Sequence, residues 1–174
     1  AAQLANVTFE IDKGSGYAAN SGEVIIDFVN AKVYVVPSLM GDGNHDIRMT
    51  YTNDNGCVDI TGDLNFTVDP EPIPVISGIP AGGYCVNVNS STISLLDNIT
   101  PLTATQLSGG RVTFELNKNA AGFVAASATE VSISGSTVSI HPNVIGEGSH
   151  QLRFTYQDDN NCTTISGEES FTVY

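Results

Sequence analysis

Apolar and polar residues alternate along several short stretches of the chain, which is the pattern of a β-strand with one buried face. The clearest stretch places His45, Ile47, Met49 and Tyr51 on one face, with polar and charged residues on the other. Residues 7–12 alternate in the same way. No stretch shows the spacing of an amphipathic helix, so the pattern predicts short strands throughout.

The whole pattern returns at a fixed offset of 105 residues. Residues 45–51 (HDIRMTY) reappear as 150–156 (HQLRFTY), and the same shift carries 7–10 (VTFE) onto 112–115 (VTFE) with no gap. A tandem repeat of this period predicts two modules of ordinary domain size.

We expect a first module over residues 1–69, a Pro-rich linker over 70–77 and a second module over 78–174. The second module has a lead-in, residues 70–110, without a counterpart in the first. Two interpretations remain open. The chain is a piece of a longer array, or the incomplete first module accepts a strand from a neighbouring subunit.

Turn residues punctuate the predicted strands at regular intervals. Asn53–Gly56 and Asp158–Asn161 follow the same strand in the two modules, and Asn and Gly tolerate the backbone of tight hairpins. Residues 14–22 and 119–128 correspond to one another, and we interpret both as a loop plus an irregular strand. Short strands with such turns predict antiparallel β-sandwiches.

The composition excludes some classes of partner. A net charge of −13, from 6 basic and 19 acidic residues, argues against nucleic-acid binding, which needs a basic face. It also disfavours attachment to anionic membranes. No segment approaches the roughly 18 apolar residues of a membrane helix, so direct membrane insertion is not expected.

Three cysteines leave the redox state open. Cys85 and Cys162 flank the second module near its two ends, which suits a disulfide in an oxidising compartment. Cys57 would then be unpaired, with the partner that the repeat implies lying outside this chain. A Cys57–Cys85 link between modules and three free thiols are the alternatives.

His45 and His150 are the most tempting catalytic residues, but their recurrence at one repeat position favours a structural role, such as a hydrogen bond at the strand end. No nucleophile elbow or zinc-protease motif accompanies them, so we do not expect an enzyme. Tyr51 and Tyr156 are also expected to be structural, because a buried tyrosine hydroxyl often bonds back to a loop at sandwich corners.

Acidic residues gather in turns and at the module junction, where calcium could bind through loop oxygens. No EF-hand spacing is present, so calcium is only a possible cofactor, and no other is expected. The residues in question are Asp54, Asp69, Glu71, Asp158 and Asp159, with Asp42 and Glu147 in nearby turns. Arg48 and Arg153 are expected to pair across strands with Glu10 and Glu115.

With these residues in view, the second module resembles the Ig-like repeats of very large Bacteroidota surface proteins, which include the gliding-motility adhesins. The resemblance rests on Gly83–Asn87 (GYCVN) and residues 145–162 (IGEGSHQLRFTYQDDNNC). Asn161 departs from the Gly that is usual there. The resemblance implies tandem immunoglobulin-like sandwiches, a cell-surface location, adhesion or filament building, and no catalysis.

These observations together predict a structural or adhesive segment of a long extracellular protein or filament, acting as a rigid spacer. The expected partners are neighbouring repeats of the same chain or filament, and surface glycans are a further possibility. One alternative is a filament subunit completed by a donated strand. The other is a carbohydrate-binding accessory module, which would use exposed rings such as Tyr17, Tyr34 or Phe123.

Overall fold

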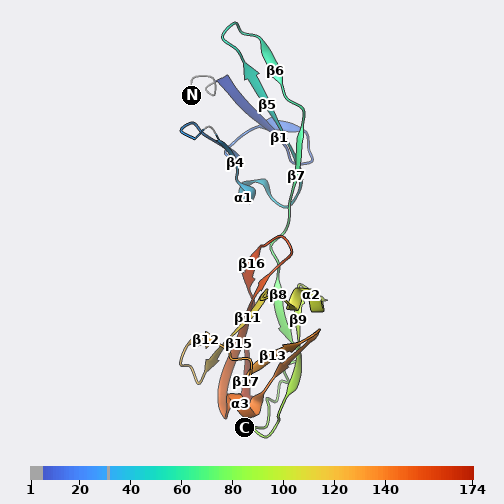
Figure 1. The fold of residues 1–174 in the computed structure, drawn as a ribbon, viewed down its shortest axis with the longest axis vertical. Helices are drawn as coiled ribbons and strands as arrows, with labels where there is room; N and C mark the ends of the chain where they lie inside the picture. The colour runs from blue at the N-terminus through green and yellow to red at the C-terminus, as the bar shows by residue number, and fades with distance from the viewer. Residues whose placement is uncertain (1–5, 31) are drawn as a thin grey trace. The chain divides into compact units, whose positions relative to one another are not determined.

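The computed structural model describes residues 6–30 and 32–174, and it is an all-β chain of antiparallel sheets (Figure 1). Its contacts divide the chain between Pro70 and Glu71. We call the parts before and after this point unit 1 and unit 2. No helix among the described residues is long and apolar enough to cross a membrane.

Unit 2 is a sandwich of two five-stranded sheets. One sheet has the order β12-β11-β15-β16, with β17 also paired to β15, and the other has the order β10-β9-β14-β13, with β8 also paired to β9. Its elements are β8 (Pro74–Ser77), β9 (Ser91–Asp97), β10 (Thr100–Pro101), α2 (Ala104–Leu107), β11 (Val112–Lys118), β12 (Phe123–Ala125), β13 (Val131–Ser134), β14 (Thr137–Ile140), α3 (Pro142–Ile145), β15 (Gly148–Gln157), β16 (Thr163–Ile165) and β17 (Glu169–Val173).

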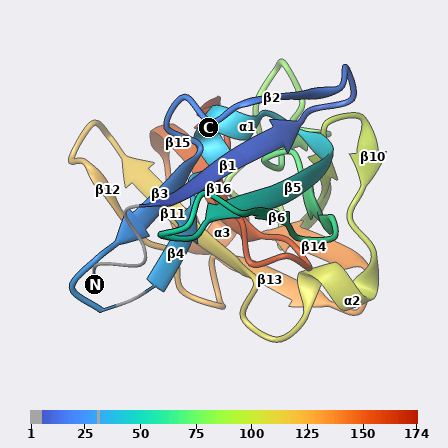
Figure 2. The same ribbon diagram turned by 90° about the horizontal axis from the view of Figure 1, so that it is seen from above.

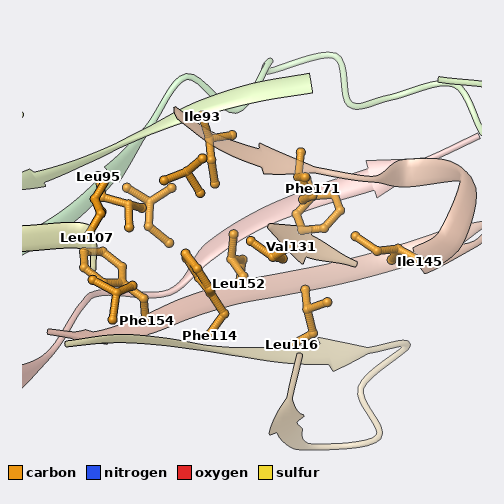
Figure 3. Close-up of a cluster of buried hydrophobic side chains, with 14 of the residues drawn as sticks. Ile93, Leu95, Leu107, Phe114, Leu116, Val131, Ile145, Leu152, Phe154 and Phe171 are labelled. Atoms are coloured by element: carbon orange, nitrogen blue, oxygen red, sulfur yellow. The ribbon is translucent and has the colours of Figure 1, made fainter. Parts of the chain in front are cut away.

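The core of unit 2 lies between these two sheets. Side chains from β9 and β13 meet those of β11 and β15, as Figure 3 shows for Ile93, Val131, Phe114 and Leu152. Along β15 every second residue is buried, which is the alternation expected of a strand with one face in the core. Burial of this apolar face is the main favourable contribution to folding.

Unit 1 repeats the first of these sheets, with the order β2-β1-β5-β6 and β7 paired to β5. β1 and β5 run side by side (Figure 2), with Phe9 opposite Met49. In the described part of unit 1, the second sheet consists of the hairpin of β3 and β4. Its elements are β1 (Val7–Asp12), β2 (Tyr17–Ala19), β3 (Val24–Asp27), β4 (Lys32–Val35), α1 (Pro37–Met40), β5 (Gly43–Thr52), β6 (Val58–Ile60) and β7 (Leu64–Val68).

The structure confirms the predicted tandem Ig-like antiparallel fold and corrects three details. The predicted linker over 70–77 is partly wrong, because Pro74–Ser77 is strand β8 and pairs with β9. The repeat, expected at a constant offset of 105 residues, contains a gap. Val24 on β3 corresponds to Val131 on β13, which is an offset of 107 residues. The cause is the turn after β3, which is two residues longer in unit 1 than the turn after β13 in unit 2. Three four-residue helices were not predicted.

Candidate functional site

One polar stack recurs on the outer face of the β1 and β11 sheets. Arg153 Nε donates to Glu115 Oε2 at 2.8 Å, and its guanidinium carbon lies 3.9 Å from the ring centroid of Phe123. In unit 1, Arg48 donates to Glu10 at 2.8 Å and lies 3.9 Å above Tyr17. The predicted cross-strand Arg–Glu pairs are therefore present. Each ion pair is partly exposed and joined to a cation–π contact, so each stack ties the edge strand to the sheet.

The same stack bears on carbohydrate binding. Flat sugars bind against the open face of an aromatic ring, yet one face of Tyr17 and one face of Phe123 are covered by arginine. Tyr34, on β4, is 47% exposed, and no row of open rings is formed by these three residues. The geometry thus gives no support to the carbohydrate-binding alternative.

A second recurring contact joins a lysine to a glutamate that is buried in unit 1 and half-buried in unit 2. Lys13 Nζ donates to Glu23 Oε1 at 2.7 Å, and Lys118 Nζ donates to Glu130 Oε1 at 2.6 Å. The hydrogen bond from Lys13, with others from the backbone and side chain of Ser21, lowers the pKa of Glu23 to about 2. Burial raises the pKa of Glu130, but the hydrogen bonds from Lys118 and from the backbone and hydroxyl of Ser127 outweigh it, and that pKa is lowered.

Sequence reasoning missed both glutamates. Glu23 and Glu130 differ by 107 residues, whereas the repeat was aligned at 105, so their correspondence was hidden. The available signal was the serine that precedes each of them, Ser21 and Ser127, whose backbone N–H and hydroxyl both donate to the carboxylate.

The two repeated histidines have structural contacts. His45 Nε2 lies 2.8 Å from the carbonyl oxygen of Gly41, and His150 Nε2 lies 3.0 Å from that of Gly146. Both side chains are buried and pack against a phenylalanine of the neighbouring strand. Each imidazole therefore ties the start of a long strand to the preceding turn, and no nucleophile is bonded to it.

The repeated tyrosines differ between the units. Tyr156 is fully buried, and its hydroxyl accepts a hydrogen bond from Gln106 on α2 at 3.0 Å. Burial raises the pKa of Tyr156, so the phenol stays protonated. Tyr51 is only half-buried, since residues 6–70, as far as they are described, contain no counterpart of α2.

The proposed calcium ligands are not brought together. Asp158 Oδ1 accepts the backbone N–H groups of Asn160 and Cys162, and Asp159 pairs with Arg111. The other residues, Asp54, Asp69 and Glu71, are exposed in turns or at the unit boundary. In the described part of the chain, no three His, Cys, Asp or Glu side chains form a group that could hold a metal ion.

The predicted Cys85–Cys162 disulfide does not fit unit 2. Cys85 follows the bridge between Tyr84 and Val173, and Val173 pairs with Gly148 at the start of β15. Cys162 lies beyond the other end of that ten-residue strand, roughly 30 Å away at the rise of a β-strand. A disulfide needs Cα atoms about 4.4–6.8 Å apart. No disulfide occurs in the described structure, and this pairing within one copy is contradicted by the register.

Cys57, in the corresponding hairpin of unit 1, is exposed. Its pairing with a cysteine outside this chain stays a prediction.

The most distinctive site of unit 2 joins a segment that follows β8 to the last residues of the unit. Residues 83–86 lie beside the terminal residues 172–174 in parallel orientation. Three backbone hydrogen bonds connect them: Tyr84 N–H to the Thr172 carbonyl at 2.8 Å, Tyr174 N–H to the Tyr84 carbonyl at 2.8 Å, and Val86 N–H to a Tyr174 oxygen at 2.6 Å. We call this pairing the terminal clamp. It is the one parallel contact between strands among the described residues.

The terminal clamp depends on Gly83 and on a buried ring. Gly83 has φ +75°, and a Cβ there would lie 2.4 Å from the Thr172 carbonyl oxygen, so only glycine allows this approach. Tyr84 is buried and packs edge-on against Phe171, with ring centroids 5.7 Å apart. Gly83 and Tyr84 are thus explained by the clamp, whereas sequence reasoning placed this segment only in the resemblance and interpreted Cys85 as a disulfide partner.

A shallow hollow of about 390 Å³ adjoins the terminal clamp. Small and polar residues line most of it, with His150 and Tyr174 at its wall. The side chains that line it include no carboxylate and no lysine.

No protein-family model matches the sequence, and no curated protein matches it. Among solved structures, dimeric latent PorU from Porphyromonas gingivalis is 16% identical, with a TM-score of 0.36 over 97% of this chain and 16% of that chain. A 1.5-MDa bacterial ice-binding adhesin is 12% identical, with a TM-score of 0.37 over 96% of this chain and 52% of that chain. Sidekick-1 immunoglobulin domains are 11% identical, with a TM-score of 0.30 over 97% of this chain and 42% of that chain. The likeness is structural only, and at these values it carries no information on function.

Proposed function

We propose that this chain is a tension-bearing segment of a long extracellular surface protein, built from repeated Ig-like units that act as stiff spacers. The single observation that carries the proposal is the terminal clamp. One of its two segments, residues 83–86, follows β8, the first strand of unit 2, and the other, residues 172–174, includes the end of β17, its last strand. They also run parallel, with three hydrogen bonds between them.

Parallel pairing determines how the clamp responds to force. Tension from the N-terminal side reaches residues 83–86 through β8, and once β8 separates from β9 it pulls them toward the N-terminus, while residues 172–174 are pulled toward the C-terminus. Because the strands are parallel neighbours, these pulls oppose one another along the strand direction. The three hydrogen bonds are then loaded together in shear, whereas antiparallel terminal strands would open one bond at a time.

The recurring contacts support a structural role for both units. The Arg–Glu–ring stack, the Lys–Glu bond and the His–carbonyl bond occupy corresponding residues and all tie one part of a unit to another. Repetition of stabilising contacts is expected of a spacer. The proposal includes an extracellular location and contact with neighbouring repeats, and it requires neither calcium nor catalysis.

Stretching single molecules tests the proposal. The chain is placed between marker domains of known unfolding length and pulled from its two ends. We expect a discrete force peak for unit 2. After it, the chain enclosed by the clamp, residues 87–171, lengthens by roughly 300 Å at the extended rise per residue. Gradual extension of unit 2 without a peak would remove the tension-bearing role.

A further inference from the structure

Strand β12 is an open edge of the first sheet of unit 2. The sheet order ends at β12, which pairs with β11 alone, and Leu116 lies opposite Val124. Unit 2 contains the lead-in of residues 71–110, whose strands β8, β9 and β10 belong to the opposite sheet. Strand β2 ends the corresponding sheet of unit 1. Among the described residues, this edge is therefore open in both units, whether or not the lead-in is present.

The register of β12 shows which of its backbone groups are available. Ala126 N–H donates to the Phe114 carbonyl at 2.9 Å. Opposite residues of an antiparallel pair alternate between hydrogen-bonded and non-bonded pairs, so the backbone groups of Val124 also face β11. Phe123 and Ala125 therefore direct their N–H and C=O groups toward the open side.

This edge carries no charge in a strongly acidic chain. Residues 119–129 (NAAGFVAASAT) include no charged residue and no proline, although the net charge of the chain is −13. The charges beside the edge are neutralised in pairs. Glu115 pairs with Arg153. Lys118 pairs with Glu130. Charge and proline are the usual protection of an edge strand against pairing, and net charge keeps copies of a protein apart. Two copies of this chain can thus approach at β12 without opposing carboxylates.

The side chains of β12 are complementary to themselves. Antiparallel pairing of two copies about Val124 places Phe123 of each copy opposite Ala125 of the other, a ring against a methyl group. The same register brings the outward backbone groups of these two residues together, and each such pair exchanges both of its N–H···O bonds. Strand β2 repeats the order of ring and methyl, with Tyr17 two residues before Ala19.

We propose that β12 is a self-association edge, at which two copies of this chain join by antiparallel strand addition in a two-fold-symmetric dimer. Backbone hydrogen bonds between the two β12 strands would supply affinity, and the sheet would continue from one copy into the next. Val124, which is 56% exposed in the single chain, would be covered by Val124 of the second copy. This lateral association belongs to the β12 edge whether or not the chain bears tension.

Sedimentation velocity of the full chain provides the first test, under reducing conditions because Cys57 and Cys85 are exposed. The wild type should shift from monomer to dimer as its concentration rises. Val124→Asp places two carboxylates opposite one another and should weaken dimerisation at least tenfold. Val144→Asp adds the same charge at a residue on α3 that is 48% exposed, and should leave dimerisation unchanged. A wild type that stays monomeric up to about 1 mM, or equal dimerisation of the two variants, would overturn the proposal.

A disulfide at the centre of the edge tests the register. In a chain whose three native cysteines are replaced by serine, Val124→Cys would bring two thiols together in a non-bonded pair. The Cα atoms of such a pair lie about 4.5 Å apart, within the range of roughly 4.4–6.8 Å that a disulfide requires. Mild oxidation should yield covalent dimer at least tenfold faster than for Val144→Cys in the same background. Circular dichroism verifies that all variants are folded. Equal rates of crosslinking would place the contact elsewhere and would also overturn the proposal.

Discussion

Single residues determine where each unit is held together. The lysine-bound glutamates, the histidines at the strand starts and the arginines over the rings all fix one element to another in the same way in both units. Gly83 acts differently, because its absent side chain allows two strands to approach. The role of Glu23 can be tested by pH, and that of Gly83 by adding a methyl group.

Gly83→Ala should destabilise unit 2, because the new Cβ would meet the Thr172 carbonyl oxygen and a non-glycine residue would be forced to φ +75°. The expected loss is about 1–3 kcal/mol of unfolding free energy. The matched control is Gly82→Ala, since a Cβ at Gly82 has no atom within 4 Å. Urea unfolding should show the control within about 0.5 kcal/mol of the wild type. Equal stability of the two variants would contradict the clamp geometry.

Glu23→Gln should destabilise unit 1 in a pH-dependent way. The pKa of Glu23 is lowered from 4.5 to about 2 by its bonds to Lys13 and Ser21. A carboxylate of this kind stabilises the fold above its unfolded pKa, and the contribution is lost as the pH falls through the folded pKa. Calorimetry should therefore find the wild type more stable at pH 7, with the difference shrinking between about pH 4.5 and pH 2.

Removal of the partner is the control for this titration. Lys13→Met should reproduce the loss at pH 7, because it removes the bond that contributes most to the lowered pKa of Glu23. A difference between wild type and Glu23→Gln that stays constant down to pH 2 would mean that the charge of Glu23 is not what stabilises unit 1.

At the scale of elements, how well the sequence predicts the structure depends on how local the interactions are. Alternation along β5 and β15 predicted both strands, their faces and the Arg–Glu pairs, because these follow from a period of two. The shift of β3 could not be seen, since a turn changes length without disturbing the strands beside it. The terminal clamp was also missed, because residues 83–86 and 172–174 are distant in sequence and meet only in the folded unit.

The two cysteines of unit 2 show how misleading sequence position can be. Cys85 and Cys162 flank the module in sequence, but β15 separates them along its length. We expect non-reducing peptide mapping of the monomeric chain to find no peptide that joins Cys85 to Cys162. Denaturing, reducing and alkylating the same sample provides the reference peptides. Recovery of the crosslinked peptide from folded monomer would show that the register of β15 and β17 is wrong.

At the scale of the whole molecule, the two units differ in the size of their cores. Among the described residues, eighteen buried apolar side chains form the core of unit 2 and five form that of unit 1. Since burial of apolar surface is the main source of stability, unit 2 should be the more stable of the two. A chain under tension would then be held by the clamped unit.

The central claim is that the terminal clamp, and not stability in general, resists force along the chain. The most direct measurement compares Gly83→Ala with Val138→Ala in single-molecule stretching. Val138 is fully buried in the sheet opposite the clamp, and its truncation should cost about 1–3 kcal/mol. We predict that Gly83→Ala lowers the unfolding force of unit 2 much more than Val138→Ala does for the same loss of stability. If both forces fall in proportion to stability, the clamp does not bear the load.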